Sequence, residues 1–286
     1  MKNTTISGYL TTNFNGILKI YDKPLIMGIL NINRDSFYKG SRFPEKECAL
    51  SQVEKMIEEG ADIIDLGYAS TRPGAPLCNA EDEIRAITPI VEAIRKKFPE
   101  IIISIDTYHA STVETLATLG IHVINDISGG RFDPKMFEAI ARHKTAYVLT
   151  HSKGTPETMQ SLTEYDDFFD EIFTYFENKI NHLQQLGIQN IIIDPGIGFA
   201  KTINQNFLLL KYLDAFQILG YPVLIGISRK SFIYKTLQTT PEDSLNGTTI
   251  MHTLVINKNP QIFRVHDVKP VKELICLYKE FQEANL

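Results

Sequence analysis

The stretch that decides the fold is Ile191-Ile192-Ile193-Asp194-Pro195-Gly196-Ile197-Gly198-Phe199-Ala200-Lys201-Thr202. Three β-branched residues in succession are typical of a strand that is buried on both faces. Pro195 has no N–H to offer a sheet, so the strand ends before it. The two glycines allow a sharp turn and a close approach of the backbone to a ligand. Alone, the stretch fits a ligand site and an ordinary turn capped by Asp194 equally well.

The same arrangement recurs along the chain, where apolar runs alternate with helical patterns. Strands are expected at Leu25–Leu30, Asp62–Leu66, Ile101–Ile105, Ile121–Ile124, Ala146–Leu149, Asn190–Ile193, Pro222–Ile227 and Ile262–Val265. Helices are expected at Glu45–Glu59, Ala80–Lys97, Ala110–Leu119, Pro134–Ala141, Asp166–Leu186, Gln205–Leu213, Pro241–Val255 and Lys269–Glu283. Strands that alternate with helices pair in parallel through right-handed crossovers. Eight such units within 286 residues predict an α/β protein with a single TIM (β/α)8 barrel. An open doubly wound sheet is the alternative, but no Gly-x-Gly-x-x-Gly follows the first strand.

Residues 1–24 stand outside this repeat. Ile6–Leu10 and Ile17–Tyr21 are β-prone, and Asn15-Gly16 lies between them. An Asn-Gly pair between two such runs is typical of a hairpin. We expect a short N-terminal β-hairpin that caps one end of a barrel formed by residues 25–286, since no linker-like composition separates a second domain.

Composition narrows the class of protein. The chain is 43% hydrophobic and 22% charged, with a net charge of −5, which argues against a nucleic-acid partner but not against an anionic ligand. Its three cysteines have no Cys-x-x-Cys spacing, as is usual for reduced thiols in the cytosol. No segment has the apolar length of a signal peptide or a membrane span. We therefore expect a cytoplasmic protein without a membrane partner.

Polar residues follow the apolar runs with a regularity that a buried strand does not need. The runs end on Asn31, Asp65, Asp106, Asn125-Asp126, Thr150-His151, Asp194, Ser228-Arg229-Lys230 and Arg264-Val265-His266. In a barrel of this kind all these ends meet at one rim, where active sites lie. The pattern therefore predicts one site built from many strands.

Asp106, Asn125 and Asp194 form a set rich in hydrogen-bond acceptors. Carboxylates and an amide can bind a ring edge that carries N–H and NH₂ donors, as they do on nucleobases. A di-metal site or an acid/base pair is the alternative. The metal alternative is weaker, because no histidine or third carboxylate stands at metal-ligand spacing.

The remaining clusters suit an anion. Asn31 offers a neutral oxygen to Mg²⁺, although a lone asparagine is more often a turn former. Arg72, in the segment 70–75, presents a planar fork for a phosphate or carboxylate, or is a solvated loop arginine. At the last two strands, residues 228–230 and 264–266 lie where barrel enzymes often bind phosphate. Asp267 could instead simply pair with Arg264.

These segments together resemble the dihydropteroate synthase family of folate biosynthesis. The matching motifs, in the family's order, are Met27–Asn31 with Asp35–Phe37, Gly60–Asp65 with Ser70–Gly74, Ser104–Thr107, Ile124–Gly130, Asp194–Phe199, Ser228–Phe232 and Arg264–Val268. The chain departs from the family's pattern at Asn33-Arg34, at Tyr38–Ser41 and at Tyr68-Ala69. All three departures follow the first or the second expected strand, in segments that are expected to form mobile loops.

The resemblance implies a transferase that joins a hydroxymethyl-dihydropterin diphosphate to p-aminobenzoate and releases diphosphate and 7,8-dihydropteroate. It implies a pterin site at Asp106, Asn125, Asp194 and Lys230, of which Asp106, Asp194 and Lys230 are also the catalytic residues. It implies a diphosphate site at Asn31 with Mg²⁺, Thr71, Arg72, Arg264 and His266. It implies a p-aminobenzoate site, the target of sulfonamides, at Arg72, Pro73, Phe199, Lys230 and Ser231. It also implies a homodimer, for which the late helices are the expected contact.

Two other functions compete with this one. A pterin-binding module without synthase activity, or the folate-binding barrel of a methyltransferase, would share the Asp/Asn/Asp set. Such a barrel would not need the Ser-Arg-Lys and Arg-Val-His clusters, both of which are present. A purely structural barrel leaves the polar strand ends unexplained.

Overall fold

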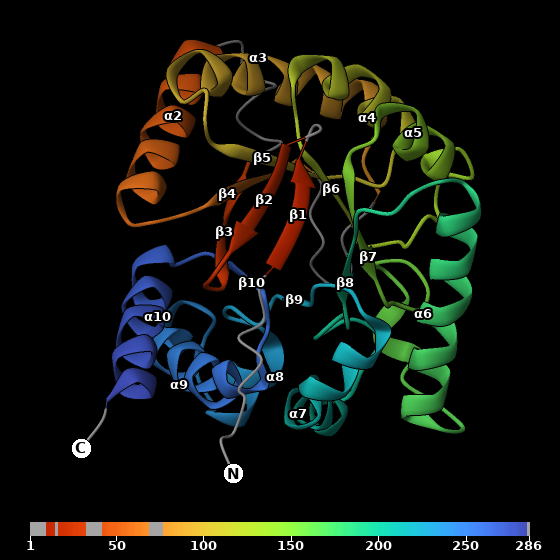
Figure 1. Ribbon diagram of the computed structural model, residues 1–286, viewed down its shortest axis with the longest axis vertical. Helices are drawn as coiled ribbons and strands as arrows, with labels where there is room; N and C mark the ends of the chain where they lie inside the picture. Colours follow the sequence, from red (N-terminus) through yellow and green to blue (C-terminus); the bar gives the residue numbers. More distant parts are fainter. Residues whose placement is uncertain (1–9, 15–16, 33–41, 69–76, 285–286) are drawn as a thin grey trace.

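The computed structural model describes residues 10–14, 17–32, 42–68 and 77–284, and a parallel β-barrel forms its centre (Figure 1). The barrel strands are β3 (Leu25–Asn31), β4 (Ile63–Gly67), β5 (Ile102–Asp106), β6 (Val123–Asp126), β7 (Ala146–Thr150), β8 (Ile191–Asp194), β9 (Leu224–Ile225) and β10 (Ile262–Val265). They follow the order β8-β7-β6-β5-β4-β3-β10-β9. A bridge between Ile193 and Val223 joins the two ends of this sheet. The predicted TIM barrel is confirmed.

Helices form an outer ring around these strands (Figure 1). They are α2 (Arg42–Glu58), α3 (Ala80–Lys97), α4 (Ala110–Leu116), α5 (Met136–His143), α6 (Phe168–Gln185), α7 (Ile203–Lys211), α8 (Ser231–Thr236), α9 (Leu245–Val255) and α10 (Val268–Glu283). Local sequence explains several of their ends. Asn79 caps α3 by accepting a hydrogen bond from the Glu81 N–H, and Thr202 with Gln205 forms a capping box at α7.

Two details differ from the expected elements. The ladder of β9 covers only Leu224–Ile225, where a strand over Pro222–Ile227 was expected, because Pro222 and Gly226 flank it. Helix α8 was not expected, since six residues are too few for a clear helical period. It begins directly after Lys230 and is followed by a 3₁₀ turn, Glu242–Ser244, so that α9 begins at Leu245.

The barrel wall separates two hydrophobic clusters. A large outer cluster lies between the strands and the helices. A smaller inner cluster fills the barrel and contains Leu25, Met27, Ile63, Ile102, Val123, Ala146, Val148, Ile192, Leu224 and Ile262. Because side chains alternate across a strand, residues two positions after these also point inward. The inward positions thus change from apolar at the amino ends of the strands to polar at their carboxyl ends.

An antiparallel hairpin of β1 (Leu10–Phe14) and β2 (Ile17–Tyr21) precedes the barrel. The expected second strand is confirmed. The described strand that pairs with it is Leu10–Phe14, with Phe14 opposite Ile17 and Leu10 opposite Tyr21. Of the expected first strand, Ile6–Leu10, residues 6–9 lie outside the described part. Tyr21 packs against the inner cluster, which places the end of the hairpin at the amino ends of the strands.

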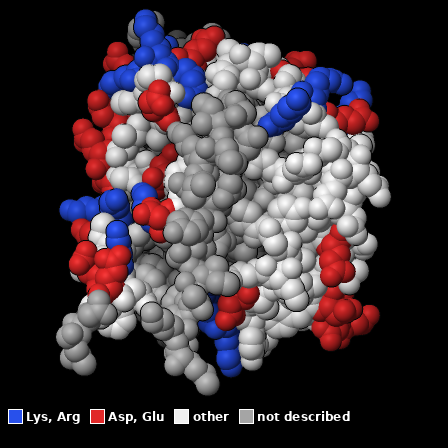
Figure 2. All heavy atoms as spheres, in the orientation of Figure 1, with Lys and Arg blue, Asp and Glu red and all other residues white. Residues whose placement is uncertain are grey.

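The surface carries both signs of charge. Figure 2 shows acidic and basic side chains interspersed around the periphery of one face rather than gathered in a basic patch. Within the described residues, none of the helices has the length and apolar character that a membrane crossing requires.

Candidate functional site

Three acceptor side chains lie at the carboxyl ends of β5, β6 and β8. Asp106, Asn125 and Asp194 are 5%, 3% and 5% exposed. Strand pairing sets Asp106 beside Asn125, and the same row continues through Gly67 to Asn31 at the end of β3. Asp194 stands at the same end of the barrel, where it pairs with Thr150 of β7.

Arg264 connects this row to a carboxylate deeper in the barrel. Its Nε donates to Asp65 Oδ2 at 2.6 Å and its Nη2 donates to Asp106 Oδ2 at 2.7 Å. The Asn125 amide donates to the same Asp65 oxygen at 3.0 Å. The alternative that Arg264 pairs with Asp267 is wrong, because one guanidinium between two buried carboxyls has closer partners.

Burial controls the charge of these acids. One arginine faces two carboxyls here, and loss of solvation raises the pKa of Asp106 to about 7 despite the neighbouring Arg264, with Asp65 adding to the rise. Burial also raises the pKa of Asp194, which Lys230 opposes. The pKa of Arg264 lies above its ordinary value, since burial is outweighed by Asp65 and Asp106, and the arginine stays charged.

The loop after β8 wraps its carbonyls around two lysines. Buried Lys201 donates to the Gly196 carbonyl at 3.1 Å and the Phe199 carbonyl at 3.0 Å, and its Nζ lies 3.0 Å from His151 Nδ1. Gly196 has a φ of 74°, and a Cβ there would lie 1.8 Å from the His151 carbonyl oxygen. Only glycine fits at this point of the loop.

The second lysine, Lys230, reaches the same loop from the residue before α8. It donates to the Ile197 carbonyl, and its Nζ lies 4.3 Å from the centre of the Phe199 ring. Burial lowers its pKa to about 8, although Asp194 and Asp106 oppose the change. Ser231 follows it directly as the first residue of α8. Lys230, Phe199 and the acids thus lie close together at the rim.

Ser228 and His266 stand next to each other at the ends of β9 and β10. The His266 N–H donates to Ser228 Oγ at 3.3 Å, and the imidazole Nδ1 lies at the same distance from it. Loss of solvation and then the charge of Arg264 lower the pKa of His266 to about 4, so the ring is neutral. Helix α10 begins two residues later, which brings its N-terminal N–H groups to this side of the rim.

Arg229 has a different role from its neighbours. It forms a two-pronged pair with Asp267 at 2.8 and 3.1 Å and donates to the carbonyls of Pro241 and Glu242. The sequence suggested it as one of the cations for a diphosphate. Its donors are instead committed to joining the loop after β9 to the N-terminus of α10.

The structure therefore brings together most of the expected site residues, namely Asn31, Asp106, Asn125, Asp194, Phe199, Lys230, Ser231, Arg264 and His266. Thr71, Arg72 and Pro73 lie outside the described residues. Sequence reasoning did not select Asp65, His151, Lys201 or Ser228 as site residues, although all but Lys201 stand at the strand ends it had singled out. Their roles depend on contacts between distant strands, which sequence spacing does not reveal.

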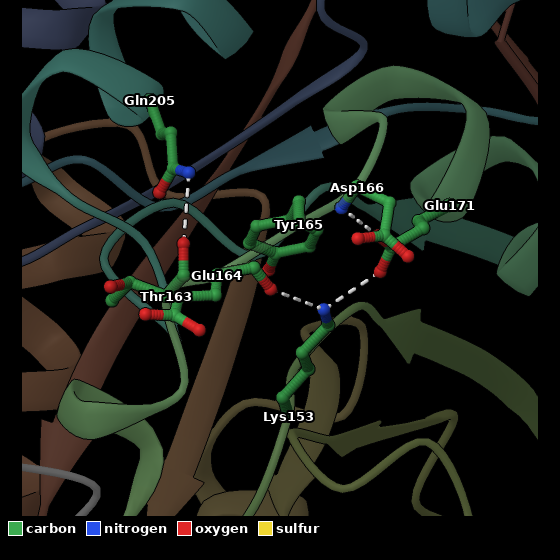
Figure 3. Close-up of a pocket in the computed structure, with 7 residues that line it drawn as sticks. All are labelled: Lys153, Thr163, Glu164, Tyr165, Asp166, Glu171 and Gln205. Carbon is green, nitrogen blue, oxygen red and sulfur yellow. Dashed lines mark hydrogen bonds and ion pairs between the residues drawn. The ribbon is translucent and has the colours of Figure 1, made fainter.

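A cavity lies beside the barrel, between the segment after β7 and the start of α7 (Figure 3). Its volume is about 580 Å³, and Lys153, Thr163, Glu164, Tyr165, Asp166, Glu171 and Gln205 line it. The Lys153 ammonium is occupied by the Glu164 carbonyl, at 2.9 Å, and the Glu171 carboxylate, at 2.8 Å. None of the expected site residues lines this cavity. Across the described ranges no group of three His, Cys, Asp or Glu side chains is arranged to hold a metal.

The fold and this site together define a class of protein. It is a (β/α)8-barrel enzyme whose polar cluster, at the carboxyl ends of the strands, combines buried acids with an arginine and a lysine. The profile of the pterin binding enzyme family matches residues 27–266. The chain belongs to this family.

Named relatives agree with the assignment. The dihydropteroate synthase of Synechocystis sp. is 40% identical over 252 residues, which are 87% of each chain. A Yersinia pestis dihydropteroate synthase structure with a sulfonamide drug complex has a TM-score of 0.89 and 33% identity, covering 96% of this chain and 100% of that one. The Xanthomonas albilineans dihydropteroate synthase with 4-aminobenzoic acid has a TM-score of 0.88 and 31% identity, covering 97% and 100%.

The raised pKa of Asp106 predicts a pH-dependent stability. Between its ordinary value of 3.8 and about 7, the folded chain holds a proton on Asp106 that the unfolded chain has lost. The contribution of Asp106 to the free energy of unfolding therefore falls as pH rises through this window. Replacement by asparagine removes this dependence. Urea unfolding at pH 5 and pH 7 should show wild type losing about 2 kcal/mol relative to Asp106→Asn.

The matched control is Asp170→Asn, an exposed carboxylate on α6. It should change stability by the same amount at both pH values. If the free energies of unfolding of wild type and Asp106→Asn differed by the same amount at pH 5 and at pH 7, the raised pKa of Asp106 would be contradicted.

Proposed function

We propose that this chain is a dihydropteroate synthase, with the chemistry carried out at the rim formed by Asp106, Asn125, Asp194, Lys230 and Arg264. The amine nitrogen of p-aminobenzoate forms a bond to the pterin methylene carbon. The bond from that carbon to the diphosphate oxygen breaks, and the diphosphate leaves with the electron pair. The amine then loses one proton. An arylamine is nucleophilic when neutral, so the reaction needs no strong general base.

Three buried acceptors at the carboxyl ends of the strands are the observation that carries the proposal. A reduced pterin presents N–H and NH₂ donors along one edge, and Asp106, Asn125 and Asp194 present oxygens to it. Asp194 Oδ1 already accepts from the Gly196 N–H at 2.8 Å, so its second oxygen is the one assigned to the ring. The Lys230 ammonium would donate to a ring acceptor, and the buried carboxylates stabilise the carbon as the leaving group departs.

The diphosphate is assigned to the side of the rim where Arg264, His266 and the N-terminus of α10 meet. A positive guanidinium and free helix N–H groups favour the charge that develops on a departing diphosphate. Thr71 and Arg72 belong to the same proposed site.

Asn31 is assigned as the ligand of Mg²⁺. Its side chain is exposed at the mouth, and a Cβ on Gly67 would lie 3.6 Å from its Oδ1 and 3.7 Å from Asp106 Oδ2. This neutral oxygen fits a magnesium ion that takes its other ligands from diphosphate and water. When bound, the ion supplies neutralising charge for the leaving group.

For p-aminobenzoate we assign the wall made of Phe199, Lys230 and Ser231, completed by Arg72 and Pro73. The contact between the Lys230 ammonium and the Phe199 ring places a cation beside an aromatic face, which suits an aromatic carboxylate. A sulfonamide would compete for this wall.

A pterin-binding barrel without synthase activity is the second candidate. It shares the three acceptors, and the buried Asp65–Arg264–Asp106 chain would serve either function. The Lys230 ammonium and the N-terminus of α10 beside the neutral His266 favour the synthase, because a binding module has no diphosphate to accept.

We further propose a cytoplasmic homodimer that contacts through α9 and α10. These neighbouring helices expose Ile250 and Leu254 on α9 (51% and 61%) and Leu277 and Phe281 on α10 (71% and 76%). Each pair is spaced four residues apart, so both lie on one side of their helix. Apolar side chains gathered in this way are typical of an interface between subunits.

The first expected outcome is the activity itself. Purified protein should release diphosphate from the pterin diphosphate only when both p-aminobenzoate and Mg²⁺ are present, and chelation by EDTA should abolish release. Coupled detection of diphosphate measures the rate. Tight pterin binding without turnover would instead favour the binding module.

Variants separate the roles of two residues. Asp194→Ala should weaken pterin binding by roughly 100-fold or more, since it removes a buried charged acceptor. Arg72→Ala should mainly slow turnover and leave pterin affinity close to wild type. Titration calorimetry and steady-state kinetics measure both, with Glu171→Gln in the cavity of Figure 3 as control. Near-normal pterin affinity in Asp194→Ala would refute the assignment of this residue.

A charged substitution in the exposed apolar face of α10 tests the proposed dimer. Leu277→Glu places a carboxylate in the exposed α10 face and should shift the protein from dimer to monomer in analytical ultracentrifugation. Leu162→Glu, an exposed leucine outside α9 and α10, is the matched control and should leave the dimer intact. A wild-type protein that sediments as a monomer at micromolar concentration would remove the proposal.

A further inference from the structure

Asp65 is a buried carboxylate that the proposed reaction does not use directly. It lies on β4 two residues after Ile63, whose side chain belongs to the inner cluster, and it is 0% exposed. Strand pairing places it beside Ile29 of β3 and Ser104 of β5. It therefore points into the barrel just below the row that contains Asp106.

Its hydrogen bonds lead to two residues of the proposed substrate site. Asp65 Oδ2 accepts from Arg264 Nε at 2.6 Å and from Asn125 Nδ2 at 3.0 Å. These partners come from β10 and β6, each separated from β4 by one strand. Within the described part of the chain its buried Oδ1 has no hydrogen-bond partner. A single oxygen thus holds a guanidinium and an amide on opposite sides of the barrel.

A neighbouring carboxylate, Asp126, has the hydrogen bonds that are typical of a structural role. Asp126 is equally buried, but it accepts from the N–H groups of Ser128 and Gly130 and from the Tyr147 hydroxyl. Those bonds shape the turn after β6 and the barrel wall. Among the described residues, the hydrogen bonds of Asp65 go instead to side chains of β6 and β10, which are two of the proposed site residues.

The contact with Asn125 determines which way its amide faces. The Asp65 oxygen accepts in this contact, so the amide must present its NH₂ group to it. The carbonyl oxygen of Asn125 is then the atom left for a bound ring, where it accepts from a ring N–H. With the amide turned over, its NH₂ would meet that N–H, and both groups would be donors without a partner.

The contact with Arg264 has a comparable effect. Asp65 binds the Nε edge of the guanidinium, which directs the Nη groups toward Asp106 and the mouth of the pocket. Loss of this anchor would leave Arg264 held by Asp106 alone.

We propose that Asp65 is the positioning residue of the pterin site, which sets the acceptor face of Asn125 and the direction of Arg264. The inference rests on the proposed function, because it takes a pterin as the ring that Asn125 binds. Asp65 itself touches no substrate atom in this scheme.

Asp65→Asn tests the proposal. The variant keeps the shape of the side chain but lets the Asn125 amide turn over. The KM for the pterin diphosphate should rise about 10- to 100-fold, the effect of losing hydrogen bonds to a charged group. The KM for p-aminobenzoate should stay within about twofold of wild type. A merely structural role would not produce this split between the two substrates.

Asp65→Ala gives the sharper result. It removes the oxygen that accepts from both Arg264 and Asn125, whereas the amide of D65N still offers one oxygen at that place. The pterin KM should therefore rise further in D65A than in D65N, and the KM for p-aminobenzoate should again stay within about twofold of wild type. D65N keeps the volume of the side chain, so it carries the test if D65A does not fold.

Asp126→Asn is the matched control for a buried carboxylate. It should lower the melting temperature and leave the pterin KM near wild type. A wild-type pterin KM in D65A, or an equal rise of both substrate KM values in D65A and D65N, would overturn the role of Asp65 while wild-type turnover still supports the synthase. If wild type itself shows no turnover, the proposed synthase fails, and calorimetry of pterin diphosphate binding by the same variants decides the role of Asp65.

Discussion

One arginine shared between two buried carboxyls is the interaction on which the site depends. Arg264 bridges Asp65 and Asp106, both of which are buried. The cluster therefore contains two carboxyl groups for one guanidinium. Removing one partner of such a buried pair costs about 3–5 kcal/mol, because the other charge is left without compensation. Burial raises the pKa of Asp106 toward neutrality, and the neighbouring Asp65 adds to this rise while Arg264 opposes it. The cluster is therefore both a structural tie between β4, β5 and β10 and a polar surface for a ligand.

The barrel makes this arrangement possible. Side chains alternate along each strand, so one set of positions fills the inside, apolar at the amino ends and polar at the carboxyl ends. Parallel pairing carries every polar end to the same rim. The loop after β8 then adds backbone carbonyls that two lysines hold in place, and Lys201 supports the loop that Lys230 touches from the other side.

Several wrong or missing expectations have one origin. The partner of Arg264, the commitment of Arg229 to Asp267 and the part played by Asp65 all depend on contacts between strands far apart in sequence. A motif shows which residue type stands at a strand end, but several acids and bases meet at the rim and their pairing follows from distance. Two other differences have local reasons. Strand β9 is shorter than expected because Pro222 and Gly226 flank it, and α8 was not expected because six residues carry too little helical periodicity.

The amino-acid sequence by itself determined the class of fold, the rim to which the site is assigned and most of the residues proposed for it. Alternating apolar runs and helical patterns leave few arrangements open, and each run marks its own carboxyl end with a polar residue. Only the tertiary structure decided which charges pair, which protons are held and which face of Asn125 is presented. Those properties depend on distance and burial, and both arise only when the strands close into a ring.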